Sequence, residues 1–395
     1  MKLKPVPLSL ILFTLFLGSI IATPSMAQQT QPSMVKILLI SPLNLEVFQR
    51  QTLTQGSILI AGQVAGNFKG HLAYLFSGKP LQGALAANWR PIAVDSFTHA
   101  FREKIQAPAG GWYRLDIQAQ LPDETVESSV TVAQVGVGEV FVISGQSNST
   151  NYGQFPQKSV SGLVSSFDGR TWVPANDPQP GVQDRSKKGS FIPAFGDALA
   201  EKYHVPIGIA STGCGATSVR QWLPQGQTFD IAPATMRSCR QIGPHEYEST
   251  GELFNGLMER IKELGPHGFR AVLWHQGESD ANQQPQSITP QQYTNFMTEI
   301  IHDSQQQAGW TFPWFVALAT YHSPSDPSNA PIRSAQKALW DSGVALPGPD
   351  TDTLGSAYRH GVHMNAKGLQ AHGLLWAQKV EVYLDKVLSE PARKI

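Results

Sequence analysis

The stretch that decides the fold is residues 139–149, with the sequence EVFVISGQSNS. A continuous apolar run passes here into a turn of glycine and small polar residues. Strands that are apolar throughout are typical of parallel sheets covered on both faces. Three similar runs follow (VPIGIAS, RAVLWH and PWFVALAT), and helix-like stretches separate them. This alternation predicts βαβ units around one parallel sheet, with a fifth, weaker strand near residues 344–346.

Residues 34–134 have a different period. Short runs such as VKILLI, SILIAGQVAG and GWYRLDIQAQL alternate apolar and polar residues, and no helical period is found between them. Regularly spaced short strands predict an all-β sandwich of immunoglobulin-like size, followed by an α/β domain over residues 135–390. Trp89 and Trp112 of the sandwich are either packing aromatics or platforms on which a sugar stacks.

The first 27 residues are predicted to be a secretory signal peptide. Lys2 and Lys4 precede an apolar stretch from Leu8 to Ile21, and small residues end the segment at Ala27. The apolar stretch is shorter than the roughly 20 residues that span a bilayer, which favours cleavage over a membrane anchor. We therefore expect an exported protein, periplasmic or extracellular, without stable membrane insertion after cleavage.

Composition excludes several classes of protein. The 395 residues are 41% hydrophobic and 15% charged, with 30 basic and 30 acidic side chains. Neither a disordered chain nor a nucleic-acid-binding protein has this balance. Cys214 and Cys239 either form a disulfide or are two buried thiols. No Cys or His motif has the spacing of a zinc site, so we expect no metal.

Residues suited to acyl transfer follow the predicted strands. Ser147 follows the first, Gly215 the second, Gln276 and Glu278 the third, and His363 precedes the last helix. Taken singly, these residues are typical of helix caps and turns. Ligands collect at the carboxyl ends of parallel strands, so the set is expected on one rim. This rim would then carry a hydroxyl, backbone amides, a carboxylate and an imidazole. These groups together indicate acyl-transfer chemistry.

The chain contains the motifs GQSN and HQGESD, a glycine turn before Trp222, and a histidine late in the chain. In these features it resembles the sialate O-acetylesterase-like carbohydrate esterases. These enzymes belong to the SGNH (GDSL-like) hydrolase superfamily, and the resemblance covers residues 135–380. It implies a three-layer α/β/α fold and serine-dependent removal of O-acetyl groups from sugars, without a cofactor. It also implies that Ser147 is the nucleophile and His363 the general base. The implied oxyanion donors are the backbone N–H groups of Ser147 and Gly215 and the side chain of Gln276.

One departure from the superfamily pattern concerns the acid of the triad. The aspartate that often stands three residues before the histidine is replaced by His360, which cannot supply a carboxylate. Glu278 is the predicted acid, with Asp280 and Asp352 as weaker alternatives. A histidine base also predicts that activity falls on acidification near the ordinary histidine pKa of roughly 6.5.

The sequence therefore predicts an exported serine esterase that deacetylates a carbohydrate through an acetyl-enzyme. The sugar stays open between sialic acids and acetylated polysaccharides such as xylan, with Trp172 and Trp222 as stacking or packing residues. Two alternatives remain. His360 favours a non-catalytic carbohydrate-binding protein on a degenerate esterase scaffold, and the same acetyl-enzyme could serve a carbohydrate O-acetyltransferase.

Overall fold

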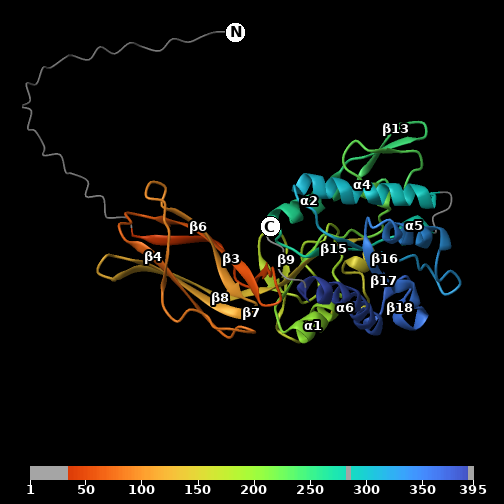
Figure 1. Ribbon diagram of the computed structural model, residues 1–395. Helices are drawn as coiled ribbons and strands as arrows, with labels where there is room; N and C mark the ends of the chain where they lie inside the picture. The colour runs from red at the N-terminus through yellow and green to blue at the C-terminus, as the bar shows by residue number, and fades with distance from the viewer. Residues whose placement is uncertain (1–33, 282–285, 390–395) are drawn as a thin grey trace, which may run out of the picture.

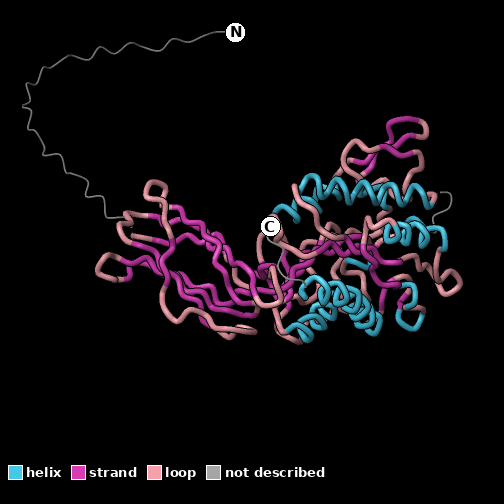
Figure 2. Tube along the Cα trace, in the orientation of Figure 1, coloured by secondary structure: helices cyan, strands magenta, loops and turns pink. Residues whose placement is uncertain are grey.

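The computed structural model describes residues 34–281 and 286–389. A part built of strands alone is joined to a part in which helices cover a sheet, as Figures 1 and 2 show. The predicted signal peptide, residues 1–27, lies outside the described residues. Within the described residues, no helix combines the length and apolar content that crossing a bilayer requires.

The N-terminal part contains two sets of antiparallel strands. One sheet has the order β1-β3-β6; beside it, β4 pairs with β5 and β7, and β7 pairs with β8. Leu115, Ile117 and Ala119 are alternate residues of β7, and all three are buried in a core that includes Ile58 and Ile60 of β3. The alternation of apolar buried residues that the sequence predicts for these strands is therefore present in the structure. The strands are β1 (Lys36–Ser41), β2 (Glu46–Gln49), β3 (Gln55–Ala65), β4 (His71–Ser77), β5 (Arg90–Ile92), β6 (Ala100–Pro108), β7 (Gly110–Gln120) and β8 (Val126–Gly145).

Strand β8 belongs to both parts of the molecule. Its first half pairs antiparallel with β7, and its second half pairs parallel with β11 (Ile207–Ser211) and β15 (Ala271–His275). The strand is only partly buried up to Gln134 and is buried continuously from Val135, because helices cover both faces of the second half. The predicted boundary between residues 134 and 135 lies at this change, inside one strand.

A parallel sheet forms the centre of the C-terminal part. Its order is β10-β9-β11-β8-β15-β16-β17, and only the edge strand β10 is antiparallel. The four apolar runs that the sequence identified are all strands of this sheet, and the weaker fifth begins at Leu346. The sequence analysis did not identify strand β9, because its sequence VSSF is short and half serine. The further strands are β9 (Val164–Phe167), β10 (Trp172–Pro174), β16 (Trp314–Leu318) and β17 (Leu346–Asp350).

Helices cover both faces of this sheet, as the sequence predicts. Phe141 and Ile143 of β8 share a core with α1 and α6, whereas Val140 and Val142 share another with α2, α4 and α5. Figure 1 shows α1 and α6 on one side of the strands and α2 and α4 on the other. The helices are α1 (Ile192–Tyr203), α2 (Glu252–Leu264), α3 (Glu278–Ala281), α4 (Pro290–Ala308), α5 (Ala330–Asp341) and α6 (Ala366–Ser389).

Short elements fill the connections, and several of them carry site residues. They are the 3₁₀ helices η1 (Ser147–Ser149), η2 (Val219–Trp222), η3 (Thr351–Thr353) and η4 (Ser356–Tyr358), and the strands β12 (Thr228–Phe229), β13 (Cys239–Gly243), β14 (Glu246–Ser249), β18 (Arg359–His360) and β19 (His363–Met364).

Candidate active site

A cavity of about 230 Å³ lies where the sequence places the site, at the carboxyl ends of the parallel strands. Ser147, Glu278 and His363 all line it, so the structure brings together three residues that are far apart in the chain. The remaining lining residues are Gln146, Asn148, Tyr152, Ala216, Ser279, His322 and Val362.

Ser147 stands at the tight turn that ends β8. Gly145 has a φ of +124°, and a Cβ atom there would lie 2.1 Å from the His275 carbonyl oxygen, so only glycine fits. The turn is closed by Ser149, whose backbone N–H and hydroxyl both donate to the Gln146 carbonyl, at 2.8 and 2.7 Å. This places Ser147 at the start of η1, buried but facing the cavity.

Glu278 is the one carboxylate among the described residues that line the cavity. Its Oε1 accepts a hydrogen bond of 2.9 Å from Asn148 Nδ2 and lies 3.8 Å from Nδ1 of His275. Burial raises the pKa of Glu278 to about 7, against the opposing effects of the Asn148 hydrogen bond and the Arg359 charge. A carboxyl of this kind is partly protonated at neutral pH.

The two alternative acids are engaged in structural contacts. Asp280 accepts hydrogen bonds from Val219 N at 2.8 Å and Gln276 Nε2 at 2.6 Å, and it also pairs with Ser218. Asp352 accepts from the backbone N–H of Thr320 and Tyr321 and forms an ion pair of 2.7 Å with Arg333. Both carboxylates therefore hold loops in place.

His363 lies in β19 with its ring stacked on Tyr152, the ring centroids 5.0 Å apart. Burial, together with the charges of Arg359, Lys188 and His360, lowers the pKa of His363 to about 4. Within the described chain, the ring makes no hydrogen bond to a carboxylate or to Ser147. The ring is therefore neutral above about pH 4, and its pKa lies below the value near 6.5 that the sequence predicts.

Glu278 reaches His363 only indirectly. The same Asn148 Nδ2 that donates to Glu278 also donates to the Val362 carbonyl, at 3.3 Å, next to His363 in the chain. His360 is exposed and pairs with His363 only through the backbone of the two-residue ladder β18–β19. Glu278 as the acid of a triad stays a prediction, since its contact with the histidine passes through Asn148 and the backbone.

The predicted oxyanion donors need a correction. The Gly215 N–H already donates to Asp184 Oδ2 at 2.6 Å, and its Cα packs so closely on Tyr152 that a Cβ would lie 2.5 Å from the ring. The Gln276 side chain is fully buried, with Nε2 donating to the Thr217 carbonyl and to Asp280. Neither group is available to a substrate in this structure.

Ala216, the neighbour of Gly215, is the residue of this turn that faces the cavity. It lines the cavity, has a φ of +57°, and its N–H makes no hydrogen bond with any described residue. The Ser147 N–H is likewise unbonded within the described chain.

Two further residues were missed in the sequence. Arg359 is buried and donates to the carbonyls of Leu354, Thr351 and Val362 at 2.6 to 2.8 Å, which holds the segment that carries His363. His322 follows β16 and lines the cavity. Both are single residues in polar loops, where no periodicity marks them.

The predicted disulfide is not formed. Cys214 and Cys239 are both free and buried, and burial raises the pKa of each thiol to about 12. The Cys214 sulfur instead accepts a hydrogen bond of 2.9 Å from Arg237. Trp172 and Trp222 are buried in the core, so both are packing residues in this structure. In the N-terminal part, Trp89 is 38% exposed, whereas the Trp112 indole N–H donates to the Gly162 carbonyl.

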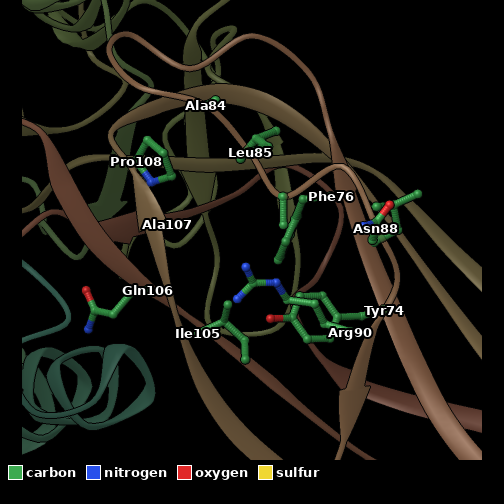
Figure 3. A pocket seen from close by; sticks show the side chains of 12 residues that line it. Tyr74, Phe76, Ala84, Leu85, Asn88, Arg90, Ile105, Gln106, Ala107 and Pro108 are labelled. Carbon is green, nitrogen blue, oxygen red and sulfur yellow. The ribbon is translucent and has the colours of Figure 1, made fainter.

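A second cavity, of about 140 Å³, lies in the N-terminal part (Figure 3). Tyr74 and Phe76 of β4 and Ile105 of β6 line it, and Arg90 lies beside the Tyr74 ring (Figure 3). The described residues that line this cavity include no serine, histidine or carboxylate. It therefore lacks a nucleophile and base, and the chemistry belongs to the first cavity.

A family model matches the part of the chain that contains every residue lining the first cavity. The model of the family described as carbohydrate esterase, sialic acid-specific acetylesterase matches residues 137–381, which is more than half of the chain. The chain belongs to this family. Membership confirms the resemblance carried by GQSN and HQGESD and makes the protein a carboxylic ester hydrolase of the carbohydrate O-acetylesterase class.

Several solved structures are similar to this chain. A carbohydrate acetylesterase from Xanthomonas citri is 17% identical, with 86% of this chain and 73% of that chain covered and a TM-score of 0.47. A protein from Arabidopsis thaliana is 19% identical, with 63% and 98% covered and a TM-score of 0.43. NanS is 14% identical, with 63% and 98% covered and a TM-score of 0.41. A search of curated proteins gives no significant match.

Proposed function

We propose that this family member is an exported serine esterase that removes O-acetyl groups from a sialic acid or an acetylated polysaccharide. The observation that carries the proposal is the cavity in which Ser147 and His363 meet two unbonded backbone N–H groups, those of Ser147 and Ala216. A hydroxyl, a neutral imidazole and free amide donors are the groups that ester hydrolysis through an acyl-enzyme requires.

The reaction proceeds in two halves. The Ser147 oxygen forms a bond to the acetyl carbonyl carbon while the His363 ring takes the hydroxyl proton. The amides of Ser147 and Ala216 donate to the oxyanion, where one lost donor typically costs about 10² to 10³ in rate. The bond to the sugar oxygen then breaks, and His363 returns its proton to that oxygen. Water, deprotonated by His363, then forms a bond to the acetyl carbonyl carbon. The bond from this carbon to the Ser147 oxygen breaks, His363 returns the proton to that oxygen, and acetate leaves.

Glu278 acts in this scheme as a positioning residue. Through Asn148 it connects the turn that carries Ser147 to the backbone beside His363, so the nucleophile and base are held by one network. His363 is neutral and can accept a proton, but its lowered pKa makes it a weak base, and no carboxylate of the described chain is hydrogen-bonded to the imidazolium that forms.

The remaining parts of the proposal rest on the sequence. Export follows from the basic, apolar and small-residue segments of residues 1–27. Residues 34–134 would be an immunoglobulin-like accessory domain and residues 135–390 the esterase domain, a division supported by the two period patterns of the sequence.

The test compares acetate release by the wild-type protein and by Ser147→Ala. The substrates are an O-acetylated sialic acid, acetylated xylan and 4-nitrophenyl acetate. The variant is expected to lose at least about 10³-fold in kcat/KM, because removing the nucleophile ends acyl-enzyme formation. Ser334→Ala, an exposed serine on α5, is the matched control and should retain activity. A folded Ser147→Ala protein with wild-type activity would contradict the proposal.

A further inference from the structure

We infer that His322 and Ser279 form the subsite that recognises the sugar hydroxyls next to the scissile acetyl ester, an inference that rests on the proposed function. Both residues line the cavity of Ser147 and His363, and neither is used in the reaction described above. The ligand class is a polyol, that is, a pyranose bearing free hydroxyls beside its O-acetyl group.

The sheet order places these residues on the side of Ser147 that faces away from the oxyanion donor. Ala216 follows β11, which lies on one side of β8, whereas Ser279 and His322 follow β15 and β16 on the other side. When Ser147 attacks, the carbonyl oxygen must turn toward the unbonded amides, on the β11 side. The alkoxy group of the ester then extends toward the loops after β15 and β16.

Ser279 has a free hydroxyl in a fixed place. Its backbone N–H donates to Gln146 Oε1 at 3.0 Å, which positions the residue next to the nucleophile. The side chain is only 6% exposed, yet its hydroxyl makes no hydrogen bond within the described chain. The hydroxyl is not among the buried polar atoms that lack a partner, so it is open to the cavity and can donate to or accept from a hydroxyl of a bound ligand.

His322 also lines the cavity, but its side chain is exposed. Its backbone is held by a hydrogen bond of 3.1 Å to the Asp326 carbonyl, in a turn that Ser323 closes with the same residue. The exposed ring makes no hydrogen bond with any described residue. A neutral imidazole offers one donor and one acceptor, which matches the paired donor and acceptor character of neighbouring sugar hydroxyls.

The test is a substrate comparison with His322→Ala, His322→Gln and Ser279→Ala. A mono-O-acetylated pyranoside carries the hydroxyls, and 4-nitrophenyl acetate lacks them. We expect His322→Ala and Ser279→Ala each to lower kcat/KM for the acetylated sugar by about 10-fold, typical of one lost hydrogen bond. The fall for 4-nitrophenyl acetate should be much smaller. His322→Gln keeps a donor and an acceptor and should restore part of the sugar activity.

His302→Ala, at an exposed histidine on α4 that does not line the cavity, is the control and should leave both activities unchanged. Folding is checked by thermal melting of each variant. An equal fall on both substrates, or no fall on the sugar, would overturn the subsite. A wild-type protein that hydrolyses neither substrate would refute the esterase function itself. This outcome is distinct from a failure of the subsite, which is judged only by comparing the variants with an active wild type.

Discussion

Replacing Glu278 by glutamine should stabilise the protein at alkaline pH and leave its stability at acid pH almost unchanged. The carboxyl is buried beside the cavity, and its pKa is raised from 4.5 to about 7. The folded protein therefore binds this proton more tightly than the unfolded chain does. Between about pH 4.5 and 7 this carboxyl ionises in the unfolded chain but keeps its proton in the folded protein, so the free energy of unfolding falls as the pH rises through this range.

The structure sets the size of the effect. At 1.36 kcal/mol for each pKa unit, the raised pKa corresponds to about 3 kcal/mol above pH 7. Glutamine does not ionise, and its side-chain oxygen still accepts the hydrogen bond that Asn148 donates to Glu278 Oε1. The variant should therefore gain about 3 kcal/mol relative to the wild type at pH 8 and almost nothing at pH 4.5.

Urea unfolding followed by tryptophan fluorescence at pH 4.5, 6 and 8 measures this difference. The control is Glu201→Gln, an exposed side chain on α1, which should show no comparable change between these pH values. The same Glu278→Gln protein should keep most of its esterase activity if Glu278 only positions the His363 segment through Asn148, because that hydrogen bond survives the change. A stability difference that is equal at pH 4.5 and pH 8 would refute the argument that burial raises this pKa.

Two further predictions concern the base and the glycine turn. Because only the neutral ring accepts the Ser147 proton, kcat/KM should fall as the pH drops through about 4, the pKa that burial sets for His363. A pH–rate profile with its acid limb near 6.5 would contradict this expectation. Gly215→Ala should destabilise the protein by about 1 to 3 kcal/mol and lower kcat, because the new Cβ would lie 2.5 Å from the Tyr152 ring that stacks on His363. Gly355→Ala, where a Cβ meets nothing within 4 Å, is the control, and equal melting temperatures for the two variants would refute the steric argument.

Sequence patterns alone located the sheet and the rim of the site. The apolar runs around Phe141, Ile209, Leu273 and Val316 predicted the parallel strands, because burial on both faces demands apolar residues at every position. Parallel strands end at a common edge, so the residues that follow them, Ser147 among them, were expected together. Ser147, Glu278 and His363 do line one cavity, and predicting this required no information on side-chain contacts.

Only the tertiary structure decided what each group at that rim can do. Whether the Gly215 amide is free depends on Asp184, 31 residues away, and the surroundings of Glu278 depend on Asn148, 130 residues away. Such contacts join polar residues of irregular loops, which follow no period and leave no trace in local sequence. The sequence by itself determined the fold class, the rim and the candidate nucleophile and base, since these follow from burial and strand direction. The free amides, the low pKa of His363 and the indirect role of Glu278 were decided by packing between distant loops.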